Sequence, residues 1–493
     1  MPEILKQVID GLEVHYHFTR IHESREYCVQ YRESDFDFVS RLMEDEGIFY
    51  HFRHSQSGHQ LVVSDTHLSH HPVSAPVKAF YNVNEMDDRG LRVHQWIKRQ
   101  QLRSGKVALW DSNFQLPGNN LHAQKGTVES VPVGSVNHKL DLGGNGHLEL
   151  YDYPAGFAKR FDAIDRHGGD QQARLQKIFE DTERMARIRM GEEAAAALLI
   201  EGSSNCSQFV SGHKFTLERH FDAAGEYVLK SIRHEAKCGS AYLSNETARD
   251  SYKNSFVCFP IHVEFRPQRK TPKPIIHGVQ TAFVVGPAGE EIFIDKHARV
   301  KLHFQWDREG KRDENSSCWV RVSQAWAGGS FGGVSHPRIG QEVIVEFEEG
   351  DPDRPIVTGR VYNAANMPHN SNAGRDGKKG NKPPKDARDS KMMTSLKSNS
   401  TPGGGGHNEI TMNDTKGGEG LFLKAQKDEI HDVGNDREDT VGNNETTKVG
   451  VAHHYAARPC PLAGGNPCRP LREALAGGTL FRRHQNHRGG GGE

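Results

Sequence analysis

The feature that most constrains the fold is a spaced repeat near the end of this 493-residue chain. From residue 433 to residue 450 the sequence reads VGNDREDTVGNNETTKVG, in which three Val-Gly pairs stand eight residues apart. Only polar residues separate these pairs. One valine per eight residues gives a single chain too little apolar surface to offset the conformational entropy lost on folding. The segment therefore predicts either a core shared between chains or a polar, disordered tail.

The composition excludes several classes of protein. Hydrophobic residues make up 35% of the chain and charged residues 26%, a balance that favours exposed strands and loops over a thick core. The net charge of -1 argues against general attraction to nucleic acid or anionic membranes. The longest apolar run, residues 194–200, is far shorter than the ~20 residues that span a membrane. The first residues lack the pattern of a secretory signal, and the scattered cysteines fit a reduced, cytosolic protein.

Two helices are predicted among many short strands. Residues 27–52 read YCVQYRESDFDFVSRLMEDEGIFYHF, which predicts a strand at 27–31, a helix capped by Ser34 and ended by Gly47, and a strand at 48–52. The second helix is expected over residues 171–197. Its apolar face is formed by Leu175, Ile178, Phe179, Met185 and Ile188.

Alternating strands indicate a small barrel in the second half of the chain. The stretch TPKP at residues 271–274 is a stiff break and a candidate domain boundary. After it, residues 299–306 alternate strictly, which places Val300, Leu302, Phe304 and Trp306 on one face. Residues 342–348 alternate similarly, with Val343, Val345 and Phe347 together. Several short alternating strands are typical of a small closed barrel such as an OB-fold. Residues 364–406 then read as a polar linker.

Three stretches together resemble one family. They are residues 27–52, residues 336–363 (HPRIGQEVIVEFEEGDPDRPIVTGRVYN) and residues 400–410 (STPGGGGHNEI). In this order they are similar to the VgrG spike proteins of the type VI secretion system, also called Vgr proteins of Rhs elements. The resemblance extends over about residues 3–450 and implies a mainly β fold with minor α content. It predicts the following regions: a phage-hub-like β-barrel region at 1–270, an OB-fold neck at 271–363, a polar linker at 364–406, the start of a β-helix needle at 407–450 and an aberrant tail at 451–493.

The resemblance also implies a trimer and explains the repeat. In an intertwined three-chain β-prism, each chain supplies one apolar side chain per layer to a shared axis. Val433, Val441 and Val449 are the expected axis residues, and Gly434, Gly442 and Gly450 are expected to relieve crowding where the chain turns between layers. Backbone hydrogen bonds between the chains would make such a prism stiff.

The implied function is that of a non-enzymatic structural spike without a cofactor. It sits on the secretion tube, punctures target membranes and helps to deliver effectors. The expected partners are two further copies of the chain, an Hcp-like tube protein, a PAAR-repeat tip protein, effector or adaptor proteins and, transiently, the target membrane. The protein would reside in the cytoplasm of the producing bacterium and then leave through the type VI apparatus. Alternatives are a contractile-phage baseplate hub, a toxin carrier with an enzymatic extension, and a defective copy that does not assemble. The cargo, the target cell and the particular tip protein stay open.

Both ends depart from the family pattern. Family members normally begin with more hub sequence, so the first hub barrel is expected to lack strands and expose edges. Residues 451–493 lose the eight-residue repeat and contain no Lys, Ile, Ser, Asp or Met. A frameshift after residue 450 is the favoured explanation, and a genuine Gly/Arg-rich adaptor tail is the alternative; either tail should be disordered.

Other motifs are weaker. Residues 328–332 (GGSFG) match the nucleophile elbow G-x-S-x-G, but that elbow needs a following helix, and Pro337 is close behind. Residues 234–238 resemble a broken H-E-x-x-H metal motif, in which Cys238 replaces the second histidine. Two further groups of histidines are candidate metal ligands: His15 with His17, and His67 with His70 and His71. In a chain with 29 histidines such groups are expected by chance. The aromatics Phe304, Trp306, Trp319 and Trp326 are expected to fill the barrel or contact neighbouring protomers, since no basic groove accompanies them to bind nucleic acid.

Overall fold

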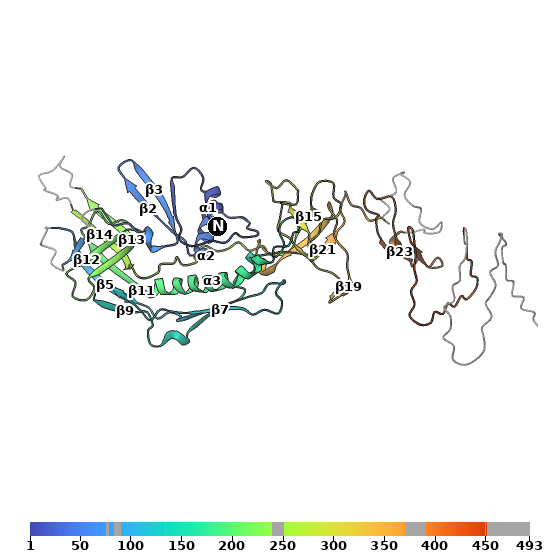
Figure 1. Ribbon diagram of the computed structural model, residues 1–493. Helices are drawn as coiled ribbons and strands as arrows, with labels where there is room; N and C mark the ends of the chain where they lie inside the picture. The colour runs from blue at the N-terminus through green and yellow to red at the C-terminus, as the bar shows by residue number, and fades with distance from the viewer. Residues whose placement is uncertain are drawn as a thin grey trace, which may run out of the picture. The chain divides into compact units, whose positions relative to one another are not determined.

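The computed structural model describes residues 1–74, 78–82, 90–133, 135–238, 251–369, 390–448 and 450. The chain divides into two units, residues 1–426 and residues 427–493. Strands dominate the first unit, and one long helix, α3, runs through it (Figure 1). Within the described residues, every helix falls short of the length and apolar character that a membrane crossing requires.

The first elements form a helix-covered sheet. They are α1 (Pro2–Val8), β1 (Val14–His17), α2 (Asp35–Glu46), β2 (Phe49–Ser55) and β3 (Gly58–Ser64), and the strands pair in the order β1-β3-β2. Helix α2 begins as predicted, because the Ser34 hydroxyl accepts a hydrogen bond from the Asp37 N–H at 3.1 Å. It also ends as predicted at Gly47, whose φ of 68° suits glycine.

The strand predicted at residues 27–31 is wrong. This segment has no strand partner and is held by side chains instead. The Val29 N–H donates to Asp353 Oδ1 at 2.7 Å, and the Val29 carbonyl accepts from Arg41 Nη2 at 3.0 Å. Burial of Val29 and its side-chain hydrogen bonds therefore hold this segment in place of a ladder of backbone hydrogen bonds.

A closed six-stranded barrel follows, in the order β11-β14-β13-β12-β4-β5. Large aromatic side chains, including Phe209, Phe215, Tyr227 and Phe256, fill its core. The strands are β4 (Lys78–Tyr81), β5 (Arg92–Gln100), β11 (Leu198–Ser204), β12 (Lys214–Glu218), β13 (Gly225–Lys237) and β14 (Ser251–Pro260).

Helix α3 (Ala173–Ala197) packs on a second sheet in the order β10-β6-β7. Four of the five residues predicted for its apolar face are buried, but Phe179 is 41% exposed, so its placement was wrong. The strands between the barrel segments are β6 (Lys106–Asp111), β7 (Leu121–Gly126), β8 (Ser130–Val133), β9 (Val136–Lys139) and β10 (Glu149–Asp152). Short 3-10 turns occur at η1 (His67–Ser69), η2 (Asn145–His147), η3 (Ala158–Arg160), η4 (Glu348–Gly350) and η6 (Ser390–Met392).

The predicted small barrel lies between residues 276 and 361. Its five strands pair in the order β16-β15-β20-β21-β17, and a bridge between Val300 and Val320 joins the two ends. Val300, Leu302 and Phe304 share its core with Val343, Val345 and Phe347, as the alternation predicted. The strands are β15 (Gln280–Val285), β16 (Lys301–Phe304), β17 (Arg321–Val322), β20 (Glu342–Phe347) and β21 (Pro355–Val361), with a separate hairpin of β18 (Trp326–Gly328) and β19 (Phe331–Gly333).

The last strands of the first unit form a three-stranded antiparallel sheet. It consists of β22 (Met393–Lys397), β23 (Glu409–Asn413) and β24 (Gly420–Lys424), paired in that order. In the second unit, residues 427–448 carry no assigned helix or strand. Residues 370–389 of the predicted linker, Val449 and the tail at 451–493 lie outside the described residues.

Candidate trimerisation surface

One face of the sheet β22–β24 is apolar and uncovered in the single chain. Leu396 is opposite Ile410, Ile410 is opposite Leu423, and Met412 is opposite Leu421. Since side chains alternate along a strand, these five residues share one face. Each is between 46% and 75% exposed. We call this set of five side chains the apolar face.

The opposite side of the same sheet carries a set of hydrogen-bonded polar groups together with Phe422, which is opposite Thr411 and 40% exposed. The Thr411 hydroxyl donates to Glu409 Oε1 at 2.7 Å, and Glu409 Oε2 lies 3.1 Å from His407 Nε2. Lys424 Nζ also lies 3.1 Å from that nitrogen. Burial alone would raise the pKa of Glu409, but the hydrogen bond from Thr411 and the positive Lys397 hold it below its ordinary value. The polar groups on this side of the sheet therefore bond to one another.

A glycine-rich loop connects β22 to β23 and touches the small barrel. Gly403, Gly404 and Gly405 have φ values of 82°, 74° and 91°, a left-handed run that residues with a Cβ rarely adopt. The Gly403 N–H donates to Glu291 of the small barrel at 2.6 Å. Arg338 Nη2 donates to the Asn399 carbonyl at 2.8 Å. These contacts attach the sheet that carries the apolar face to the small barrel.

Buried ion pairs join the small barrel to the preceding region. Arg299 Nη2 lies 3.0 Å from Asp162 Oδ1, and Arg299 Nε lies 2.7 Å from Asp295 Oδ2. All three side chains are at most 3% exposed. Burial alone would raise the pKa of Asp162, yet the hydrogen bonds and charge of Arg299 hold it below its usual value. Charges buried this deeply persist only when they are paired, so Arg299 joins the small barrel to the segment between β10 and α3.

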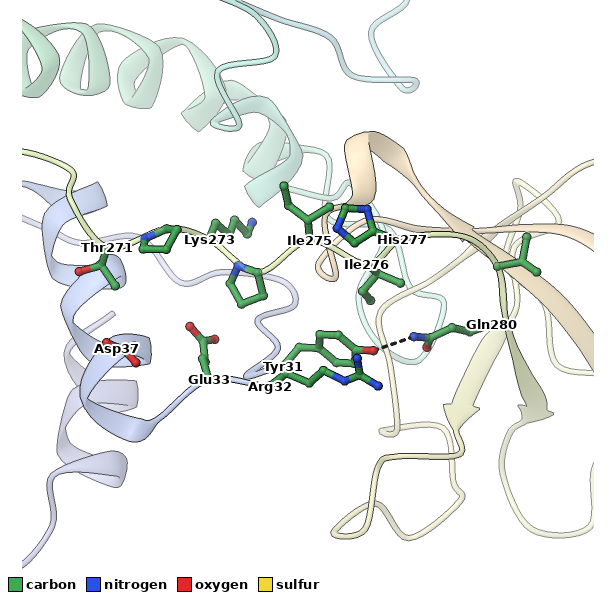
Figure 2. Close-up of a pocket in the computed structure, with 13 residues that line it drawn as sticks. Tyr31, Arg32, Glu33, Asp37, Thr271, Lys273, Ile275, Ile276, His277 and Gln280 are labelled. Atoms are coloured by element: carbon green, nitrogen blue, oxygen red, sulfur yellow. Dashed lines mark hydrogen bonds between the residues drawn. The ribbon is translucent and has the colours of Figure 1, made fainter.

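A groove lies between residues 31–37 and the segment 271–280 (Figure 2). Its volume is about 600 Å³, and two extended stretches, residues 31–33 and 271–280, supply most of its lining. The Tyr31 hydroxyl accepts a hydrogen bond from the Gln280 amide at 3.1 Å across it. Lys273 pairs with Asp351 at 2.7 Å.

The residues predicted for the needle are exposed in the single chain. Val433 is 49% exposed and Val441 50%. At Gly434, Gly442 and Gly450 no described atom lies within 4 Å of the place a Cβ would take. Val449 lies outside the described residues. The single chain does not bring the described valines and glycines of the repeat together. Their roles in a needle stay a prediction.

The weaker motifs are placed as follows. Ser330 is an exposed turn residue between β18 and β19 and is followed by a strand, whereas a nucleophile elbow needs a helix there. His234 lies in β13, with its Nδ1 2.5 Å from the Tyr252 hydroxyl. Among the described residues, no group of three or more His, Cys, Asp or Glu is arranged to hold a metal ion. Phe304 and Trp319 are buried, while Trp326 is 65% exposed.

Sequence reasoning missed a buried histidine cluster. The ring centroid of His51 lies 5.7 Å from that of His70 and 5.8 Å from that of His213. Both ring nitrogens of His51 are buried without a hydrogen-bond partner among the described residues. Burial, followed by the neighbouring histidines, lowers the pKa of His51 to about 3. The signal for this cluster was the alternation of β2, which places His51 between exposed aromatic residues.

Three family models match the chain. "Phage tail baseplate hub (GPD)" matches residues 1–240, "Type VI secretion system/phage-baseplate injector OB domain" residues 294–362, and "Bacteriophage T4 gp5 C-terminal trimerisation domain" residues 394–456. The predicted mainly β fold with barrel domains and an OB-type barrel is therefore confirmed.

Curated relatives match nearly the whole chain. The type VI secretion system spike protein VgrG1b of Pseudomonas aeruginosa is 38% identical over 457 residues, covering 91% of this chain and 56% of the relative. The VgrG1a spike protein of the same organism is 37% identical over a match that covers 90% of this chain and 63% of that relative. The actin cross-linking toxin VgrG1 of Vibrio cholerae is 35% identical over a match that covers 91% of this chain and 37% of that relative.

The chain thus spans between 56% and 63% of the length of these two Pseudomonas relatives. A solved Escherichia coli type VI secretion component, described as similar to the T4 tail proteins gp27 and gp5, aligns with a TM-score of 0.43 and 16% identity over 73% of this chain and 71% of that one. From the matches to relatives and family models, the chain belongs to the VgrG family of type VI secretion spike proteins.

Proposed function

We propose that this chain is one protomer of a trimeric spike in a type VI secretion apparatus. The observation that carries the proposal is the apolar face of β22–β24. Its five large side chains are exposed in one chain, and a three-stranded sheet with one apolar side is stable only when that side is covered. Covering it contributes about 1 kcal/mol per half-exposed side chain, or about 5 kcal/mol per protomer. The match to a trimerisation domain over the same residues supports two further copies as the cover.

The eight-residue repeat continues this trimer as a needle. Val433, Val441 and Val449 supply the shared axis, and Gly434, Gly442 and Gly450 allow the turns between layers. A prism held by hydrogen bonds between chains is stiff. It transmits a contractile stroke to a target membrane, and this mechanical role requires no enzymatic chemistry from the chain.

The partners follow from the spike role. The region at 1–270 docks on an Hcp-like tube protein, a PAAR-repeat protein caps the needle, and effector or adaptor proteins travel with the spike. The protein is made in the cytoplasm and leaves through the apparatus. A contractile-phage baseplate hub is the second candidate, because the model matching residues 1–240 describes a phage tail hub. Binding of the purified chain to Hcp-like rings, compared with phage tail-tube rings, distinguishes the two.

Light scattering on the full chain tests the trimer. One chain has a mass of 55.1 kDa, so the expected particle is about 165 kDa. Ile410→Asp places a charge on the apolar face and should shift the particle to monomer. Lys416→Ala in the exposed β23–β24 turn changes the net charge equally and should stay trimeric. A monomeric wild-type chain would refute the proposal.

A further inference from the structure

The hairpin β18–β19 is a second uncovered surface. Residues 325–335 are all exposed in the single chain. Trp326 is 65% exposed, Phe331 62% and Val334 69%. None of residues 324–335 carries a charged side chain, which is the composition of the buried centre of a protein interface and not of an ordinary surface loop.

The hairpin is built to hold its two aromatic rings in one geometry. The ring centroids of Trp326 and Phe331 are 5.7 Å apart, at an interplanar angle of 77°, which is a favourable edge-to-face contact. A Cβ at Gly328 would lie 2.3 Å from the Phe331 ring, and one at Gly332 would lie 2.4 Å from the Trp326 carbonyl oxygen. Glycine at both positions is therefore required for the pair to form.

The base of the hairpin is anchored, although its tip is exposed among the residues that the structure describes. The Ser335 N–H donates to Gln324 Oε1 at 3.0 Å, and Arg360 Nη1 of β21 donates to the Ser335 hydroxyl at 2.9 Å. A two-stranded hairpin without a packed face is marginal in water. An anchored hairpin that displays three large apolar side chains therefore needs a partner surface.

The connections of the hairpin identify that partner as a second copy of this chain. Three residues after Ser335, Arg338 donates to the Asn399 carbonyl in the loop between β22 and β23. The hairpin base thus adjoins the sheet that carries the apolar face. Copies joined through the apolar face present their hairpins to one another at a high effective concentration.

We propose that the Trp326–Phe331 hairpin packs against a neighbouring copy of this chain and forms a collar at the neck of the trimer. This inference rests on the trimer proposed above. In a three-fold assembly each protomer offers one hairpin and receives one, so the contacts close into a ring. The two aromatic rings are the anchors of each contact, as aromatic side chains often are in interfaces.

Photo-crosslinking tests the collar in the full chain. Replacing Phe331 with the photoreactive p-benzoyl-phenylalanine should give covalent dimer and trimer bands on a denaturing gel after illumination. The same replacement at Phe221, which is 85% exposed and lies in the turn between β12 and β13, should give far less. A trimer by light scattering without intermolecular bands from position 331 would overturn the collar alone. A monomer would overturn both the collar and the trimer.

A second measurement uses Trp326→Ala. The variant should remain trimeric through the apolar face but lose thermal stability and gain faster amide exchange at residues 326–333. Tyr362→Ala, at an exposed aromatic residue of the same barrel, should leave both unchanged. If Trp326→Ala matches wild type in both readouts, the tip of the hairpin is free in the assembly and the proposal is wrong.

Discussion

The ion pair at Arg299 offers a quantitative test of how the small barrel is joined to the segment between β10 and α3. Replacing Arg299 with Gln removes the positive charge that lies between Asp162 and Asp295. Both carboxylates are almost fully buried, so solvent cannot replace the lost partner. The change also removes the guanidinium that sits 5.1 Å from the ring centre of Phe114.

The magnitude follows from the burial of the three side chains. Breaking a buried pair by removing one partner typically costs about 3–5 kcal/mol, because the remaining charge is left unpaired. A nearby exposed pair supplies the control: Lys296 and Asp170 connect the same two regions but are 43% and 65% exposed. Exposed pairs contribute about 0–1 kcal/mol, so Lys296→Gln should be nearly silent.

The assay is urea unfolding at neutral pH, followed by intrinsic tryptophan fluorescence. Trp319 reports the joint, because its indole N–H donates to the Asp165 carbonyl at 2.7 Å. We expect a clearly lower midpoint for Arg299→Gln and an unchanged midpoint for Lys296→Gln. Equal midpoints for the two variants would refute the reasoning, since they would show that burial of the pair does not set its contribution.

Three further predictions concern pH and the glycine-rich loop. Burial and the adjacent Asp162 raise the pKa of Glu26 to about 8, so the folded state holds a proton that the unfolded state releases. Stability should therefore fall as pH rises from about 4.5 to 8. Glu26→Gln should remove this part of the pH dependence of the thermal unfolding temperature. The pKa of His51 is lowered to about 3, so stability should be lost as pH falls from about 6.5 toward 3; His51→Leu should reduce this acid sensitivity, and an unchanged pH profile would contradict it. Glu291→Ala should accelerate amide exchange at residues 399–406, whereas Glu290→Ala beside it should not; equal exchange in the two variants would show that the loop is held by other contacts.

Local signals predicted the elements that depend on local chemistry. Ser34 and Gly47 bound α2 because a cap and a left-handed stop act within one helical turn. The strand predicted at 27–31 was wrong because contacts with residues far along the chain, such as Asp353, hold this apolar segment without a strand partner. Phe179 failed for a related reason, since periodicity gives a face but not the edge at which packing ends.

The candidate surfaces were only partly visible in the sequence. Residues 410–412 and 421–423 alternate in the sequence, but their pairing into one apolar face depends on register, which a single sequence does not specify. Trp326 had two interpretations, barrel filling or contact with a neighbouring protomer. Its exposure of 65% excludes the first within the chain, and this is the observation on which the collar depends.

Two joints together describe how force would pass along one protomer. Arg299 ties the N-terminal region to the small barrel through buried charges, while Glu291 and Arg338 tie the small barrel to the sheet β22–β24 through hydrogen bonds to backbone groups. A buried charge pair resists displacement, because separating it leaves unpaired charges. The hydrogen bonds to the glycine-rich loop are exposed and weaker. Under load the protomer should therefore yield first between the small barrel and β22–β24, where a trimer would add the apolar face and the collar as reinforcement. The collar variants should weaken this second joint and leave the joint at Arg299 intact.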